Sequence, residues 1–529
     1  MCFGCSLQAL AGLSADGPSL RRLFPGGAAR GQTVEVTAAG EAPQWPVSIW
    51  SDDPAIRWEA LADKGKFRVT VDPGAGLGVH HVRFYDKQNA TDALRFVVGP
   101  VAECNEQEPN DSLSKAQVVA TLPQTINGVL EKRGEVDTFA VDLAANQTLV
   151  AALDATRSLR SPVDATLQIV SPRGIVLAQN LDTLELDPRI VFTAKSAGKY
   201  SIRVFGFPET PDSTISFGGG DTWVYRLTLT NSGWLAAAQP LAVSGIEATT
   251  VQPLVVGGQT AQPVTVPAVA ISDIPKPFPL HIANVAASVL PLDVLTIPLQ
   301  GEPRVAADQA SPVLNLPVSM TGCLDQAQQV DRYRFSAKKG DKLRFALHAR
   351  QFGLPIDGVL RIVDADGKQL AREDDTQKTA DCTLNWTAPS EGTFVLEVSD
   401  AFGKGGAEWL YRVDMQAVQS DVRLTVKSDH FQGKVNQPLE VVVAIDRRDG
   451  FAEPVSVSVA GMPAALKADA VVSQKEGDSA KEVKLQIVAT ESFSGPIRIF
   501  GEVNGQAPGK RWATAAGDPL LGDFWLTFQ

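Results

Sequence analysis

The sequence is poor in the residues that usually carry catalysis or covalent cross-links. Its 529 residues include only five cysteines and five histidines. So few cysteines exclude a disulfide-dense scaffold. Neither an HExxH zinc-protease motif nor a GxSxG nucleophile elbow occurs, so the best-known signatures of metallohydrolases and serine hydrolases are missing. We therefore expect a protein that is not an enzyme and has no catalytic residues.

Long apolar runs and basic clusters are missing as well. No run reaches the roughly 18 consecutive apolar residues that a membrane-spanning helix needs, so we expect no membrane span. The formal net charge is −12, and an acidic surface repels the phosphates of nucleic acid, so we expect no nucleic-acid partner. The same excess of carboxylates is compatible with cations, including calcium.

The N-terminal residues 1–17 form a segment of their own. Residues 1–15 are apolar and rich in small side chains, like the end of a signal peptide, but the basic leader of a signal peptide is absent. Two readings stay open: a signal remnant or a disordered tail. Cys2 and Cys5 form a CxxC pair here, but no second pair lies at zinc-like spacing, so we assign no metal to it. The remnant reading places the protein outside the cytoplasm, in the extracellular space, the periplasm or at the cell surface.

Short alternating segments dominate the rest of the chain. Apolar and polar residues alternate in 67–71, 200–204, 343–347 and 394–398, and glycine (44 residues) and proline (34 residues) punctuate the chain throughout. A period of two places one face of a strand on a core and the other in water. Stretches with helical period are short. The sequence therefore predicts an all-β fold of antiparallel sheets.

An internal repeat is the most informative feature of the sequence. Five successive landmark spacings are 9, 27, 10, 13 and 11 residues in the first copy and 9, 26, 10, 14 and 11 in the second. Each copy has the size of one β-sandwich domain. The repeated aspartates are interpreted as turn residues that accept hydrogen bonds from backbone N–H groups. The landmarks are Gly128, Asp137, Asp164, Gly174, Asp187, Gly198 and Tyr225, repeated as Gly322, Asp331, Asp357, Gly367, Asp381, Gly392 and Tyr411.

Both copies resemble the pre-peptidase C-terminal domain, a jelly-roll-like β-sandwich found in secreted bacterial proteases and other extracellular proteins. The first copy also carries the opening motif of that family, which reads EQEPND at residues 106–111. The second copy departs from it, because residues 302–308 read EPRVAAD, and this puts a shared ion site in doubt. The resemblance implies tandem β-sandwiches: two pre-peptidase domains plus immunoglobulin-like domains.

The opening motif is the strongest candidate for a ligand site. Calcium prefers six to eight oxygen ligands, and alternate residues of an extended segment share a face. Some members of the family bind calcium with this stretch and an acidic residue near the first strand, which implies a structural calcium ion here. A solvated turn is the alternative reading of the motif. The expected metal ligands are Glu106, Glu108, Asn110, Asp111 and Asp137, with Glu135 close by.

The segments around the repeat also read as β-modules. The beginning of the chain resembles a TIG or immunoglobulin-like domain and the end an immunoglobulin-like domain, while the segment between the two copies is a small β-domain or a linker layer. The expected division is 1–17 (tail), 18–100 (TIG/immunoglobulin-like), 104–230 (first pre-peptidase domain), 231–302 (small β-domain), 303–416 (second pre-peptidase domain) and 421–529 (immunoglobulin-like).

These observations together predict a non-catalytic secreted binding or scaffolding protein with a calcium-stabilised first pre-peptidase domain. Two alternatives stay open: a non-catalytic portion of, or accessory to, a secreted peptidase, and a structural component of the cell surface. An extracellular protein or polysaccharide is the expected class of ligand, and the sequence determines neither its identity nor the oligomeric state. A disulfide between Cys323 and Cys382 is also left open, because their separation in space does not follow from the sequence.

Overall fold

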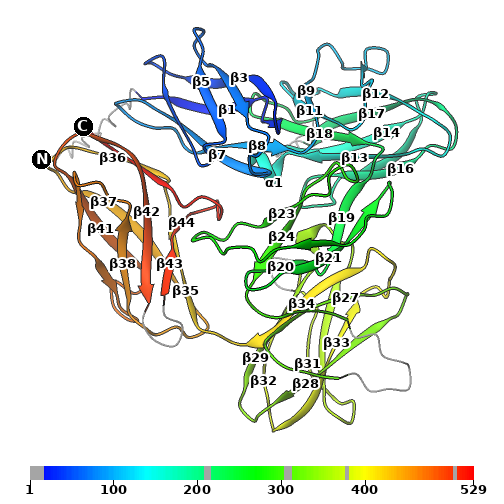
Figure 1. The fold of residues 1–529 in the computed structure, drawn as a ribbon, viewed down its shortest axis with the longest axis vertical. Coiled ribbons are helices and arrows are strands. Elements are labelled where there is room, and N and C mark those ends of the chain that lie inside the picture. Colours follow the sequence, from blue (N-terminus) through cyan, green and yellow to red (C-terminus); the bar gives the residue numbers. More distant parts are fainter. Residues whose placement is uncertain (1–16, 208–215, 303–311, 376–380, 504–508) are drawn as a thin grey trace, which may run out of the picture.

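The protein folds as a series of β-sheets (Figure 1). The computed structural model describes residues 17–207, 216–302, 312–375, 381–503 and 509–529. Within these ranges the helices are one turn of α-helix, α1 (Thr156–Leu159), and a 3-10 turn, η1 (Arg350–Phe352). Among the same residues, none of the helices has the length and apolar character to cross a bilayer. The predicted all-β fold class is confirmed.

The N-terminal sandwich packs two four-stranded sheets, in the orders β1-β3-β6-β5 and β2-β8-β7-β4. Its strands show why the alternating pattern folds this way: in β6, Phe67, Val69 and Val71 are buried while Arg68 faces water. The strands are β1 (Ser19–Phe24), β2 (Gly27–Ala29), β3 (Thr33–Glu41), β4 (Ser48–Ser51), β5 (Ile56–Ala60), β6 (Lys66–Val71), β7 (Gly78–Tyr85) and β8 (Leu94–Gly99).

The first repeat copy forms a sandwich of two five-stranded sheets, β10-β12-β17-β14-β15 and β16-β13-β18-β11-β9. We call it the first repeat sandwich. Its strands are β9 (Glu103–Asn105), β10 (Gln117–Val118), β11 (Gln124–Val129), β12 (Asp137–Leu143), β13 (Thr148–Asp154), β14 (Asp164–Val170), β15 (Val176–Asn180), β16 (Arg189–Thr193), β17 (Gly198–Phe207) and β18 (Val224–Thr230).

The second repeat sandwich repeats that topology strand for strand, with sheets β26-β28-β33-β30-β31 and β25-β27-β34-β29-β32. Its first strand lies ahead of the boundary expected at residue 303, because β25 pairs with β27 and not with the preceding sheets. Its strands are β25 (Leu299–Gly301), β26 (Val313–Leu314), β27 (Val318–Cys323), β28 (Val330–Ala337), β29 (Lys342–His348), β30 (Gly358–Val363), β31 (Gln369–Glu373), β32 (Thr383–Thr387), β33 (Gly392–Asp400) and β34 (Leu410–Ala417).

Between the two repeat sandwiches lies a middle unit of two three-stranded sheets, β19-β21-β22 and β20-β24-β23. Its core is continuous with that of the second repeat sandwich, since Leu241 and Val243 belong to the same buried cluster as Phe335 and Tyr411. The strands are β19 (Trp234–Gln239), β20 (Ala242–Ser244), β21 (Thr249–Val256), β22 (Val264–Val266), β23 (Phe278–Leu280) and β24 (Leu290–Leu295).

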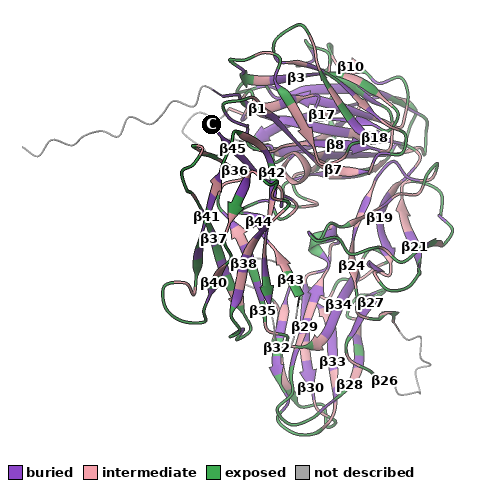
Figure 2. Ribbon diagram, turned by 60° about the vertical axis from the view of Figure 1, so that its left-hand side comes forward, coloured by how far each residue is buried: buried purple, intermediate pink, exposed green. Residues whose placement is uncertain are grey.

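The C-terminal sandwich has the sheets β39-β41-β37-β35-β44 and β36-β45-β42-β38-β40, with β43 beside β42. Figure 2 shows the buried residues running along its strands and the exposed ones at its edges and loops. The strands are β35 (Asp421–Val426), β36 (His430–Gly433), β37 (Leu439–Arg448), β38 (Val455–Ala460), β39 (Leu466–Ala468), β40 (Val471–Ser473), β41 (Glu482–Ala489), β42 (Phe493–Val503), β43 (Gly509–Trp512), β44 (Thr514–Ala515) and β45 (Phe524–Phe528).

The chain returns on itself, so that the C-terminal sandwich contacts the N-terminal sandwich (Figure 1). The Trp525 ring lies 4.5 Å from the ring of Tyr85 and 6.2 Å from that of Trp50, measured between centroids. A buried carboxylate, Asp518, accepts hydrogen bonds from His81 and Arg95. We call this contact, formed by segments more than 300 residues apart, the closing interface.

Two minor expectations are also resolved. Cys323 and Cys382 are both free thiols, so the disulfide left open by the sequence does not form in this structure; Cys2 and Cys5 lie outside the described residues. The repeated aspartates do bind backbone N–H groups: Asp187 accepts from Ala155 and Thr156, and Asp381 makes the equivalent contacts in the second copy. The capping interpretation of these two residues is confirmed.

Candidate metal centre

The start of the first repeat sandwich places Glu106 beside the first long strands. β9 runs parallel to β11, and the Glu106 N–H continues the ladder by donating to the Asn127 carbonyl at 2.9 Å. The next landmark, Gly128, lies opposite Tyr225 of β18. A Cβ at Gly128 would overlap the Tyr225 ring and lie 2.7 Å from Glu106 Oε2, so only glycine fits between them. The Glu106 carboxylate thereby reaches the start of β12, where Asp137 lies.

Three carboxylates meet at this point. Single oxygen atoms of Glu106, Glu108 and Asp137 all lie within 4.8 Å of one another. The Tyr225 hydroxyl is 2.6 Å from Asp137 Oδ2 and 3.2 Å from Glu106 Oε2, and its single proton can serve only one of them at a time. The Val129 N–H donates to Glu106 Oε1 at 2.7 Å. Most of the oxygen lone pairs in the group are therefore not used by protein donors.

Asn110 adds a buried amide to the same turn. Its N–H donates to Glu108 Oε2 at 3.0 Å, and the residue is 0 % exposed. Among the described residues, neither the Oδ1 nor the Nδ2 of its side chain has a hydrogen-bond partner, and Asp137 Oδ1 is likewise buried without one. Unpaired buried polar atoms are costly and rare in native proteins, so these call for a ligand or ordered water.

The electrostatics of the group oppose three ionised carboxylates. Burial, reinforced by the charge of Asp137, raises the pKa of Glu106 to about 10. Burial also raises the pKa of Asp137 to about 7, and burial raises the pKa of Glu108 above its usual value. A bound divalent cation would reverse this balance, because it favours the ionised form of every carboxylate around it.

Not every residue expected from the sequence joins the group. Asp111 is exposed, and its Oδ2 lies 3.6 Å from Lys115 Nζ, outside the set of three carboxylates. Glu135 is buried and accepts a hydrogen bond from the Lys132 N–H at 3.1 Å, while its charge acts on Glu108 and Asp137. Sequence reasoning missed the role of Tyr225, which it used only as a repeat landmark; the recurrence of tyrosine at that position was the available signal.

The second repeat sandwich keeps half of this arrangement. Glu302 continues the β25 ladder by donating to the Thr321 carbonyl, as Glu106 does in the first copy, and the Tyr411 hydroxyl lies 2.6 Å from Asp331 Oδ2. Burial and the charge of Asp331 raise the pKa of Glu302 to about 7. By equal offset, Glu108 and Asn110 correspond to Arg304 and Ala306, which lie outside the described residues and have no carboxylate or amide. The second copy thus offers a natural comparison for the first.

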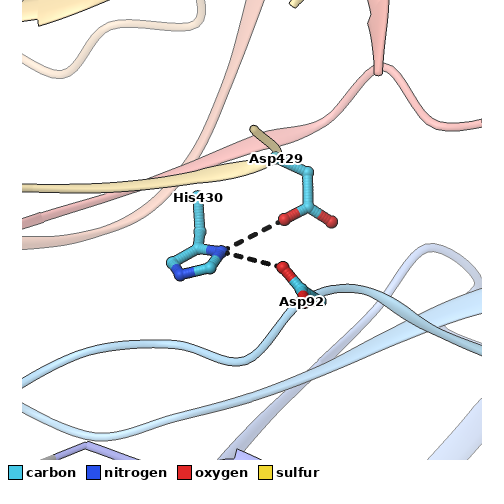
Figure 3. Close-up of side chains that lie close together, drawn as sticks. All are labelled: Asp92, Asp429 and His430. Atoms are coloured by element: carbon cyan, nitrogen blue, oxygen red, sulfur yellow. Dashed lines mark hydrogen bonds and ion pairs between the residues drawn. The ribbon is translucent and has the colours of Figure 1, made fainter. Parts of the chain in front are cut away.

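A second cluster, formed by Asp92, Asp429 and His430, lies in the closing interface (Figure 3). The His430 Nδ1 is 3.2 Å from Asp92 Oδ1 and 3.2 Å from Asp429 Oδ1. Asp429 Oδ2 also accepts from the Ala93 N–H and pairs with the buried guanidinium of Arg83. Hydrogen bonds to Asp429 and Asp92 raise the pKa of His430 to about 9. Because these groups already neutralise one another, we interpret the cluster as an ion-pair clamp between the two sandwiches.

Comparisons with known proteins find similarity among solved structures. No protein-family model matches the chain, and no curated protein matches it. The pre-peptidase C-terminal domain of a collagenase from Bacillus anthracis is similar over 24% of this chain and 100% of that domain, at 15% identity and a TM-score of 0.18. Fibronectin(III)-like modules of Clostridium thermocellum CbhA are similar over 36% of this chain and 86% of theirs, at 14% identity and a TM-score of 0.13.

A longer match is to trypsin-activated alpha-2-macroglobulin from Escherichia coli, at 10% identity and a TM-score of 0.13. It covers 97% of this chain but only 42% of that one.

Proposed function

We propose that this chain is a non-catalytic, secreted binding or scaffolding protein whose first repeat sandwich is stabilised by a calcium ion. Glu106, Glu108, Asn110 and Asp137 are the proposed ligands. The observation that carries the proposal is the combination of three carboxylates within 4.8 Å and a fully buried asparagine amide with no partner among the described residues.

The donor set favours calcium over other common ions. All proposed ligands offer oxygen, and the cluster contains neither the histidine nor the cysteine that zinc usually takes. Magnesium demands a tight octahedron and gives up its water reluctantly, whereas calcium accepts irregular sets of six to eight oxygens. Waters and carbonyl oxygens would complete the shell. The ion would convert mutual repulsion of the carboxylates into coordination.

Such an ion would act on the connection between modules. The segment that bears Glu106, Glu108 and Asn110 directly follows β9, where the N-terminal sandwich joins the first repeat sandwich. Nearby protein contacts already brace this junction: Arg226 pairs with the buried Glu103, and Gln32 Nε2 donates to the Glu103 carbonyl at 2.9 Å. Calcium would tie the next residues to β12, and so hold the two sandwiches at a constant angle. A rigid chain of sandwiches suits a scaffold or a binding protein.

Calorimetry of the full chain tests the proposal. Binding to the native state alone stabilises by RT ln(1 + [Ca²⁺]/Kd), about 2.7 kcal/mol at a hundredfold excess over Kd. We expect one transition to rise in calcium relative to chelator, and magnesium to replace calcium poorly. Identical thermograms in calcium and in chelator, together with no heat of binding on titration, would overturn it.

Three variants sharpen the measurement. Glu108→Gln should remove most of the calcium-dependent shift, while Asp111→Asn, outside the group, should leave it unchanged. Asn110→Leu keeps a similar volume but removes the two unpaired amide atoms, so it should stabilise the calcium-free protein and yet abolish the calcium response. A full calcium response in Asn110→Leu would exclude this amide as a ligand.

A further inference from the structure

A cavity lies where the modules meet. It has a volume of about 810 Å³, within the range of roughly 300–1,000 Å³ that is usual for sites of small ligands. Its wall includes residues from all five modules, from Gly76 of the N-terminal sandwich to Leu520 of the C-terminal sandwich. Its lining includes residues of α1, β8, β23 and β24, and these elements lie near the middle of Figure 1. Junctions between domains are frequent positions for ligand sites.

Part of the wall is apolar. Trp234 of the middle unit, Phe352 of the second repeat sandwich and Leu520 of the C-terminal sandwich all line the cavity, together with Val289. The cavity therefore offers an apolar surface with aromatic side chains on it.

The charged part of the wall is unbalanced. The acidic side chains are already occupied: Asp187 binds the N–H groups of Ala155, Thr156 and Arg157, and Asp154 lies 3.9 Å from Arg226 and accepts from the Ser158 N–H. Glu185 is exposed at the rim.

Two arginines of the wall, Arg157 and Arg189, differ from the rest. Across the described ranges, neither guanidinium makes a hydrogen bond or an ion pair, although the charge of Glu408 acts on Arg189. Burial lowers the pKa of Arg189, so its charge is partly removed from water. A partly buried guanidinium with no hydrogen-bonded carboxylate has N–H donors that an anionic ligand can use.

We propose that this cavity binds a small amphipathic carboxylate, with its apolar body against Trp234 and Phe352 and its carboxylate on the guanidinium of Arg189. Arginine presents a planar fork of N–H donors that matches a carboxylate in two parallel hydrogen bonds. The proposal does not depend on the calcium site, because none of the four proposed calcium ligands lines the cavity.

Fluorescence titration of the full chain with 1-anilinonaphthalene-8-sulfonate, an aromatic anion, tests this directly. We expect saturable binding at one site, and displacement of the probe by dodecanoate but not by the uncharged dodecanol. Arg189→Gln should weaken probe binding by at least about tenfold, the loss of one charge-assisted hydrogen-bonded pair. Arg173→Gln, an exposed arginine on the same sandwich, is the matched control and should bind like the wild type.

Circular dichroism and thermal melting establish that each variant is folded. If Arg189→Gln does not fold, the difference between dodecanoate and dodecanol on the wild-type protein decides the matter. Equal displacement by the two compounds, or wild-type affinity in a folded Arg189→Gln protein, would overturn the proposal. Glu108→Gln should still bind the probe, so failure of the calcium proposal and failure of this one are distinguishable.

Discussion

Asp518 is the residue whose loss should most disturb the closing interface. Its carboxylate is 2% exposed; Oδ1 lies 2.7 Å from Arg95 Nη2, and Oδ2 lies 3.1 Å from both Arg95 Nε and His81 Nε2. Arg160 of the first repeat sandwich reaches the same carboxylate at 3.4 Å. Burial alone would raise the pKa of Asp518, but the hydrogen bonds from His81 and Arg95 hold it well below its usual value. One anion thus joins three modules.

The change Asp518→Asn removes that charge while keeping the shape of the side chain. It leaves the guanidinium of Arg95, 7% exposed, buried without an anionic partner, whereas His81, 2% exposed, keeps Asp52 at 3.5 Å from its Nδ1. Removing one member of a buried ion pair typically costs about 3–5 kcal/mol. At about 1.4 kcal/mol per factor of ten, the closed arrangement should become less favoured by roughly two to three and a half orders of magnitude.

Hydrogen exchange and small-angle X-ray scattering measure this effect. We expect amide exchange in β7, β36 and β45 to accelerate by roughly a hundredfold or more and the radius of gyration to rise. Asp523→Asn is the matched control, because Asp523 pairs with Arg498 at 2.9 Å within the C-terminal sandwich and takes no part in the closing interface. If Asp518→Asn has the exchange rates and scattering of the wild type, our account of the closing interface is wrong.

Two further predictions follow from single contacts. The pKa of His430 is raised from the usual 6.5 to about 9, so the ion-pair clamp should contribute its full stabilisation below about pH 6.5 and lose it as the pH rises through 9. Rates of amide hydrogen exchange in β36, measured against pH, would show this loss. His430→Gln should abolish the pH dependence. Gly128→Ala should lower the free energy of unfolding by about 1–3 kcal/mol, because the new Cβ would overlap Tyr225. Gly392→Ala is the control and should lower it less, because a Cβ there would make ordinary contacts at 3.8 Å. Denaturant midpoints compare the two variants, and equal midpoints would refute the close packing at Gly128.

Much of the fold was predictable because its signals are local. The alternation in β6 and β29 reports which face of each strand is buried, and this depends only on the pleat of the backbone. The repeat spacings predicted more of the fold than the alternation did, because nearly equal spacings between turns accompany the same strand order in both copies. The boundary before the second copy was less accurate, because β25 joins that sheet through a parallel pairing that leaves no pattern in its three residues.

The candidate metal centre was predictable in part for the same reason. Glu106, Glu108 and Asn110 occupy alternate positions of one extended segment, and alternate side chains share a face. Asp111 breaks that alternation, and the structure places it outward with Lys115. The buried hydroxyl of Tyr225 came from a strand more than 80 residues further along, so nothing near the motif announced it.

The sequence by itself determined the class of structure, the two sandwich copies and the chemical character of the opening motif, because each depends on neighbours within a strand or a turn. Tertiary structure alone decided which distant groups meet. The pairing of His81 with Asp518 spans 437 positions, and the cavity that brings Arg189 to Trp234 and Phe352 exists only once the modules are packed. Such contacts depend on the register of strands and on the angles between sandwiches. Small differences in packing determine both, and no local sequence pattern encodes them.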